Sequence, residues 1–83
     1  MYDKEFKNDW DIDVFMKLAK ASLHAGGWIS YKDFYEKEQP CNGIMYFGMA
    51  IDNLVGLKYV KRLGTRCNLT DTGLKRYNAI LGA

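Results

Sequence analysis

The chain has 83 residues, 48% of them hydrophobic and 14% aromatic, which suffices for one packed domain and leaves no room for a second. Its two cysteines are too few for a disulfide framework and lack the spacing of a metal site. No apolar run approaches the roughly 20 residues of a membrane span, so we expect a cytoplasmic protein with no cofactor and no membrane contact. The net charge of +2 is uneven, because residues 1–13 carry a net charge of −3 and residues 58–76 carry +5. Such clustering attracts an acidic partner.

The chain begins with a polar segment of mixed charge, which we expect to form an arm over residues 1–9, ahead of a domain over residues 10–83. Phe6 can still pack back onto that domain. Asp9 or Asp11 is placed to cap the first helix, because a short acidic side chain accepts hydrogen bonds from the unpaired N–H groups of a helix N-terminus.

The first helix is predicted to run up to Gly26-Gly27, because glycine suits the left-handed conformation that ends many helices. Trp28-Ile29 follows and is long enough for a stub of strand. Residues at helical spacing define the buried face of the helix: Val14, Phe15, Leu18, Ala21 and Ser22.

A short second helix is expected over residues 31–37, with Phe34 buried. Ser30 stands where a capping residue would, three positions before Asp33. This helix should stop before Pro40, because the proline ring disfavours helical backbone at the preceding residue.

The third helix is expected to start near Cys41 or Asn42 and to end at Gly56 as its C-cap. One apolar stripe runs along it at helical spacing: Ile44, Phe47, Ile51 and Leu54, with Val55 beside it. This stripe indicates the face that enters the core, which leaves the other face of the helix for solvent or a partner.

A hairpin and a closing helix complete the chain. Residues 57–63 favour a strand, Gly64-Thr65 makes a tight reversal, and residues 67–69 return as a second strand. Thr70 caps the last helix. The buried face of that helix is predicted from its spacing: Leu74, Tyr77, Ile80 and Leu81.

Two segments resemble a known family. Residues 54–62, Leu-Val-Gly-Leu-Lys-Tyr-Val-Lys-Arg, resemble the stretch of MarR-like and PadR-like regulators in which the recognition helix ends at a glycine and enters the wing. Residues 68–77 resemble their wing exit, a Leu-Thr-x-x-Gly leading into a helix. The resemblance covers about residues 28–77 and implies a mostly helical α+β fold. That fold is a winged helix-turn-helix with three helices, a small β-hairpin wing and a C-terminal helix.

The hairpin concentrates positive charge at its tip. Lys61, Arg62 and Arg66 flank the reversal, and in winged-helix proteins that bind DNA the wing runs along the backbone or into the minor groove. Cations there neutralise phosphates and release counterions, with Lys32 on the second helix as a further contact. The alternative is a solvated hairpin whose charges prevent edge-to-edge pairing of strands.

The outer face of the third helix is less typical of a DNA reader. Asn42, Met45 and Tyr46 would approach the major groove, yet the sequence between Gln39 and Gly56 has no lysine or arginine. Met45, Tyr46 and Met49 also form a candidate patch for another protein, because methionine makes adaptable apolar surface.

Three interpretations of the methionines stay open. They are partly buried beneath the arm, or they form a dimer or partner interface, or the helix binds DNA weakly. Gly43 and Gly48 add to the question, because each destabilises a helix interior by about 1 kcal/mol relative to alanine. Such residues often mark the close approach of another element or a ligand.

The sequence does not favour an enzyme, because His24 is the only histidine and no nucleophile, base and acid can be assembled around it. The leading hypothesis is a small transcriptional regulator that binds double-stranded DNA as a homodimer. The alternative is a winged-helix protein-interaction module that uses the apolar outer face of the third helix. A phage- or plasmid-encoded modulator of a host factor would be one example.

Overall fold

The computed structural model describes residues 6, 9–38 and 44–82, with the backbone alone at Ile44. Within these residues the fold is α+β, with four helices and a small antiparallel sheet of three strands. The elements follow one another as α1 (Asp9–Ala25), β1 (Ile29–Ser30), α2 (Tyr31–Glu38), α3 (Ile44–Gly56), β2 (Val60–Leu63), β3 (Arg66–Leu69) and α4 (Asp71–Gly82).

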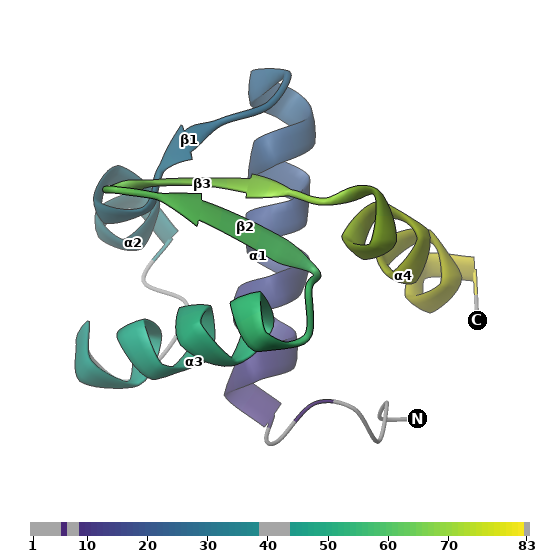
Figure 1. Cartoon of the computed structure of the whole chain (residues 1–83), viewed down its shortest axis with the longest axis horizontal. Helices are drawn as coiled ribbons and strands as arrows, with labels where there is room; N and C mark the ends of the chain where they lie inside the picture. Colours follow the sequence, from purple (N-terminus) through teal and green to yellow (C-terminus); the bar gives the residue numbers. More distant parts are fainter. Residues whose placement is uncertain (1–5, 7–8, 39–43, 83) are drawn as a thin grey trace.

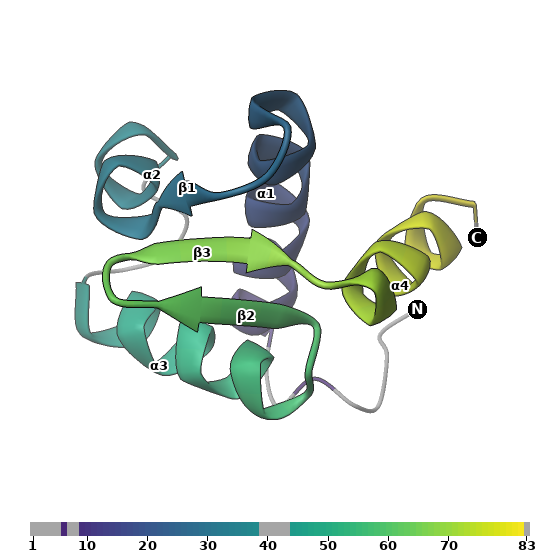
Figure 2. The same cartoon turned by 45° about the horizontal axis from the view of Figure 1, so that its top comes forward.

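The sheet has the strand order β1-β3-β2, and both pairings are antiparallel. Figure 1 shows α1 running behind the sheet, α3 alongside β2, and α4 beyond the end of β3. The turn between β2 and β3, helix α2 and the N-terminal end of α3 lie at the same end of the molecule in Figures 1 and 2. The last helix lies at the opposite end.

The end of α1 confirms the glycine signal. The Gly26 N–H donates to the Leu23 carbonyl at 3.3 Å, and the Gly27 N–H donates to the Ser22 carbonyl at 2.9 Å. These two bonds make a Schellman motif, which requires a left-handed residue after the helix. Gly26 and Gly27 have φ values of 77° and 147°, so both positions suit glycine.

The core lies between α1, α3 and the sheet. It contains the expected stripe residues Phe15 and Leu18 of α1 and Phe47 of α3, all fully buried. Phe6, from the predicted arm, is 7% exposed, and its ring centroid lies 5.5 Å from that of Phe15 and 5.7 Å from that of Tyr59. This part of the arm therefore packs onto the domain.

Asp11 does not cap α1. The helix begins at Asp9, and the buried stripe of α1 starts at Asp11, which is 0% exposed. There Asp11 accepts a hydrogen bond of 3.0 Å from the Asn53 side-chain amide, so it joins α1 to α3. A buried carboxylate needs such a partner, because its desolvation is otherwise costly.

Helix α2 begins as the sequence predicts, since the Asp33 N–H donates to Ser30 Oγ at 3.4 Å. Phe34 is buried, and the helix extends to Glu38. The expected start of the third helix at Cys41 or Asn42 lies outside the described residues.

Helix α3 ends at Gly56 as predicted, but Gly56 is not the left-handed residue of the cap: that residue is Lys58, with φ 66°. The Lys58 N–H donates to the Val55 carbonyl at 3.0 Å, and the Tyr59 N–H donates to the Leu54 carbonyl at 3.1 Å. Placing the left-handed residue two positions after Gly56 brings Tyr59 into the core, where it is 4% exposed. The same turn delays β2 to Val60, three residues after the predicted start of the strand.

The hairpin and α4 confirm two predictions, the tight reversal at Gly64-Thr65 and the cap of the last helix at Thr70. Leu63 pairs with Arg66 across a two-residue reversal in which Gly64 has φ 61°. The Gly73 N–H donates to Thr70 Oγ1 at 2.9 Å, as expected of a helix cap. The predicted burial of Leu81 is wrong: it is 60% exposed, because α4 packs on the body through its first turns and Tyr77.

Candidate functional site

Arg62 lies on the core side of the β2–β3 hairpin. It pairs with Cys67, which is 0% exposed, and side chains directly opposite each other share one face of a sheet. Its guanidinium donates to the Tyr31 hydroxyl at 3.1 Å and to the Gly64 carbonyl at 3.2 Å, and Nη1 lies 3.5 Å from Asp52 Oδ1. The guanidinium carbon also lies 4.9 Å from the centre of the Tyr31 ring.

These contacts fix the hairpin to α2 and α3. A second attachment lies at the tip, where the Tyr31 N–H donates to the Thr65 carbonyl at 3.0 Å. Strand β3 also pairs with β1, so β3 is the central strand of the sheet and β2 is an edge strand. Arg62, predicted as a phosphate contact, therefore has intramolecular partners for each of its guanidinium nitrogens.

Lys61, Leu63 and Arg66 occupy the opposite, outer face of the hairpin. Alternation along β2 separates Lys61 and Leu63 from Arg62, and Arg66 is paired with Leu63. All three side chains are exposed. Lys61 Nζ lies 5.7 Å from the centre of the Trp28 ring, a cation–π arrangement on that face. We call Lys61, Leu63 and Arg66 the outer hairpin face.

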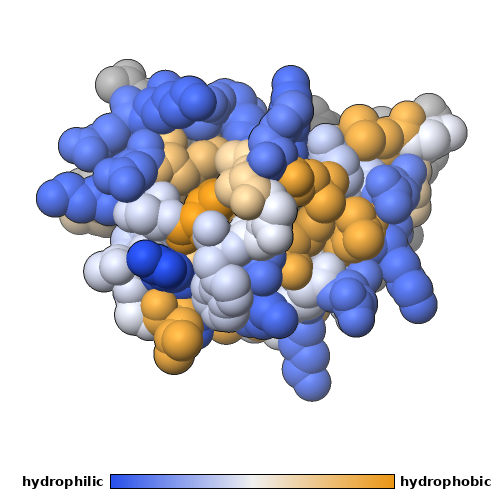
Figure 3. All heavy atoms as spheres, turned by 90° about the horizontal axis from the view of Figure 1, so that it is seen from above, coloured by the Kyte–Doolittle hydropathy of each residue, from blue (hydrophilic) through white to orange (hydrophobic). Residues whose placement is uncertain are grey.

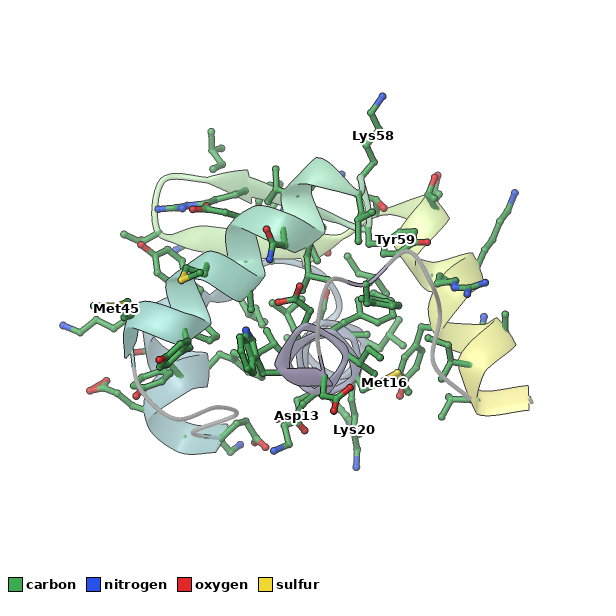
Figure 4. The ribbon with its side chains drawn as sticks, turned by 90° about the horizontal axis from the view of Figure 1, so that it is seen from below. Asp13, Met16, Lys20, Met45, Lys58 and Tyr59 are labelled. Atoms are coloured by element: carbon green, nitrogen blue, oxygen red, sulfur yellow. The ribbon has the colours of Figure 1, made fainter. Side chains whose placement is uncertain are left out.

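Two further cations, the predicted contact Lys32 and the unassigned Lys58, lie apart from the core. Lys32 is exposed on α2, the helix that contacts the hairpin tip. Lys58 is exposed in the turn after α3, and Figure 4 shows its side chain pointing away from the body of the molecule. Asn42, the predicted polar contact at the start of the third helix, lies outside the described residues.

The outer side of α3 exposes apolar and aromatic side chains. Met45 is 72% exposed, Met49 49% and Tyr46 42%, so the interpretation that the methionines pack beneath the arm is wrong. Figure 4 shows Met45 at the outer edge of the molecule. Trp10 of α1 adjoins them, because its ring centroid lies 5.3 Å from that of Tyr46 in a T-shaped contact. We call Trp10, Met45, Tyr46 and Met49 the α3 apolar face.

Trp10 is the member of this surface that the sequence analysis did not assign. The sequence indicated only that Trp10 lies one helical turn before Val14, at the margin of the buried stripe of α1. A residue at such a margin can face the core, solvent or a neighbouring helix, and the choice depends on where α3 lies. The structure leaves Trp10 37% exposed beside Tyr46.

Ser22 is buried and has a structural role. Its hydroxyl lies 2.7 Å from the Gly27 carbonyl and 2.9 Å from Asn68 Oδ1, and it accepts a longer bond of 3.4 Å from the Leu69 N–H. These contacts tie the end of α1 to β3. His24 lies two positions along the same helix and is exposed, so the two side chains form no nucleophile and base pair.

The C-terminal end of α1 forms a shallow groove with α4, lined by Lys20, Leu23, His24 and Tyr77. Figure 3 looks down on this side of the molecule, where hydrophobic residues lie among hydrophilic ones.

Among the described residues, no group of three or more histidine, cysteine or acidic side chains is placed to hold a metal ion.

Burial raises the pKa of the Cys67 thiol to about 11, although the nearby Arg62 guanidinium acts in the opposite direction. The thiol is therefore protonated at neutral pH and is not a ready nucleophile. It forms no disulfide. Cys41, the other cysteine of the sequence, lies outside the described residues.

The chain matches no protein-family model, no curated protein and no solved structure. None of the helices in the ranges that the structure describes is both long and apolar enough to cross a membrane. Two exposed surfaces, the outer hairpin face and the α3 apolar face, are therefore the candidate binding sites of the described residues.

Proposed function

We propose that the chain is a winged helix-turn-helix protein that binds double-stranded DNA through its wing and regulates transcription. The succession of elements supports the fold, because a helix, short strand and two helices are followed by a hairpin and a closing helix. In this assignment α2 and α3 form the helix-turn-helix, and β2 with β3 forms the wing.

The observation that carries the proposal is the position of Lys61 and Arg66. Both are exposed on the outer hairpin face, away from the acidic partner that Arg62 contacts, and Lys61 lies over the Trp28 ring. Lysine and arginine on a projecting surface bind phosphates, and each phosphate contact releases a counterion. The attachments through Arg62 and Thr65 hold this surface in one arrangement, which lowers the entropic cost of binding.

Lys32 extends the basic surface of the wing onto α2, at the end of the molecule where the hairpin turns (Figure 2). Helix α3 contributes no lysine or arginine. The proposal therefore assigns the phosphate contacts to the wing and α2 and does not depend on Met45 or Tyr46 entering the major groove.

The test is the salt dependence of binding to a short labelled duplex, followed by fluorescence anisotropy. We expect the slope of log K against log salt to become shallower by about 2 in a Lys61→Gln, Arg66→Gln variant, because each phosphate contact contributes roughly 0.9. Lys17→Gln with Lys20→Gln is the matched control, since it removes the same charge from α1. An unchanged slope in the wing variant, or no salt-dependent binding by the natural sequence, would refute the proposal.

We also propose that the protein acts as a homodimer on DNA, because one module of this size offers few base and phosphate contacts. Two copies would place two wings on neighbouring stretches of the duplex. Sedimentation velocity of the protein with and without duplex gives the stoichiometry. One protein chain per binding site at saturation would contradict the dimer.

A further inference from the structure

The α3 apolar face groups four exposed apolar or aromatic side chains. Its four side chains come from two helices, and each of them is at least 37% exposed. Exposed methionine and aromatic residues that adjoin one another are typical of protein-binding surfaces, and aromatic side chains there often supply much of the binding energy.

The face is also held in place from beneath. Trp10 and Tyr46 are in T-shaped contact, and Asp11, the residue after Trp10, accepts the 3.0 Å hydrogen bond from Asn53 of α3. Asp11 is fully buried and Asn53 is half-buried, so this bond is partly shielded from water. A partner would therefore meet an aromatic pair whose two helices are already joined, which reduces the ordering that binding requires.

Gly48 leaves room for a close approach. It lies within α3 between Phe47 of the core and Met49 of the exposed face, and a Cβ added there would meet nothing within 4 Å. Glycine destabilises a helix interior relative to alanine, and no element of the described chain packs against this position to account for it. A second backbone can come closer to a helix where a side chain is absent.

The charge around the face is negative. Residues 9–16 and 44–56, which supply it, contain the exposed carboxylates of Asp9 and Asp52 and the partly exposed carboxylate of Asp13, and no lysine or arginine. Lys17 of the same helix lies 3.4 Å from Asp13, and Arg62 of β2 lies 3.5 Å from Asp52, so these two cations offset part of this charge. The face disfavours phosphates, and it also disfavours a second α3 apolar face of the same sign.

We propose that the α3 apolar face docks an amphipathic helix of a partner protein, with an apolar stripe flanked by lysine and arginine. The apolar stripe of this helix covers Met45, Met49 and the Trp10–Tyr46 pair. Its lysine and arginine side chains meet the carboxylates beside the face, which are those of Asp9, Asp13 and Asp52. This interaction is separate from the DNA contacts of the wing, so the protein would connect a basic helix of its partner to DNA.

The probe is a pair of designed helical peptides of roughly 18 residues, long enough to form a helix in water. Both carry leucine at i, i+3, i+4 and i+7, the spacing of anchors that dock one helical face. One has lysine and arginine flanks and the other has glutamate flanks. Binding of fluorescently labelled peptide to the full chain is measured by anisotropy, and we expect the basic peptide to bind at least about ten-fold more tightly.

Met45→Gln with Met49→Gln removes the apolar surface without changing charge. We expect it to weaken binding of the basic peptide by about ten-fold or more. Leu23→Gln with Leu81→Gln is the matched control, because these leucines are 48% and 60% exposed on α1 and α4. It should leave binding unchanged. Thermal unfolding followed by circular dichroism checks that both variants fold.

Four results would overturn the proposal. The glutamate peptide binding equally well would remove the charge argument, and equal losses in both variants would show non-specific adhesion. A dimer of the natural sequence that Met45→Gln, Met49→Gln dissociates would identify a second copy as the occupant. A lower DNA affinity of that variant would assign the face to DNA. Failure of DNA binding alone leaves the peptide result standing, so the two proposals fail separately.

Discussion

Two helical glycines with opposite surroundings give a prediction at the scale of single residues. A Cβ at Gly73 would collide with the carbonyl oxygen of Tyr59, whereas a Cβ at Gly48 meets nothing within 4 Å. We expect Gly73→Ala to destabilise the fold by about 1–3 kcal/mol or more through overpacking. Gly48→Ala should stabilise it by up to about 1 kcal/mol. Urea unfolding of the two variants measures both changes, and the same sign in both would contradict the packing.

Lys58 supplies a second prediction at this scale. It is exposed, and it is the one residue other than glycine with a positive φ among those described, at 66°. A left-handed conformation costs an ordinary residue roughly 1 kcal/mol that glycine avoids. We expect Lys58→Gly to raise the free energy of unfolding by somewhat less than about 1 kcal/mol, because glycine also makes the unfolded chain more flexible. Lys58→Ala, which keeps the unfavourable conformation, should give no such gain in urea unfolding.

At the scale of the element, the β2–β3 hairpin combines a residue that holds it in place with residues that face outward. Arg62 contacts Tyr31, Asp52 and the Gly64 carbonyl, while its neighbour Lys61 lies over Trp28 on the outer face. Substituting the two separately distinguishes attachment from binding.

We expect Arg62→Gln to destabilise the protein by about 1–2 kcal/mol, because it removes a cation–π contact and partly exposed hydrogen bonds. Amide hydrogen exchange in β2 and β3 should become faster in this variant. Lys61→Gln should change stability by less than about 0.5 kcal/mol while lowering the salt dependence of DNA binding. Unchanged exchange in Arg62→Gln would show that the contacts of its guanidinium do not hold the hairpin in place.

At the scale of the whole molecule, Cys67 links stability to alkaline pH. Its thiol has a pKa of about 11 in the folded protein, against 9.0 for an unperturbed thiol. Below pH 9 both states keep the proton, so the stabilisation is fully present. Between pH 9 and 11 the unfolded state loses the proton first, so the free energy of unfolding falls.

This loss is measured by urea unfolding from pH 8 to 11 in the natural sequence and in Cys67→Ala. Lysines and tyrosines titrate in the same range, so the difference between the two pH profiles isolates the thiol. We expect Cys67→Ala to be less stable at pH 8, because it leaves a small cavity, and to have the flatter profile. Parallel profiles would show that the thiol is not shielded from water in the folded state.

The sequence by itself determined the features that depend on neighbouring residues. Gly26-Gly27 ends α1, Ser30 and Thr70 cap their helices, and Gly64 lies in the reversal of the hairpin. Each of these follows from hydrogen bonds that span only a few residues or from the φ angle of one residue. The apolar stripe of α3 also followed from spacing, since Phe47, Ile51 and Leu54 are all buried.

Only the tertiary structure decided which surfaces are available for binding. Arg62 and Lys61 are adjacent cations in the sequence, and it is the pairing of β2 with the buried Cys67 that turns one toward Tyr31 and the other outward. The burial of Asp11 and the joining of Trp10 to Tyr46 likewise depend on where α3 packs against α1. The contacts of Arg62 with Tyr31, of Asp11 with Asn53 and of Trp10 with Tyr46 join residues more than 30 positions apart, which local periodicity does not encode.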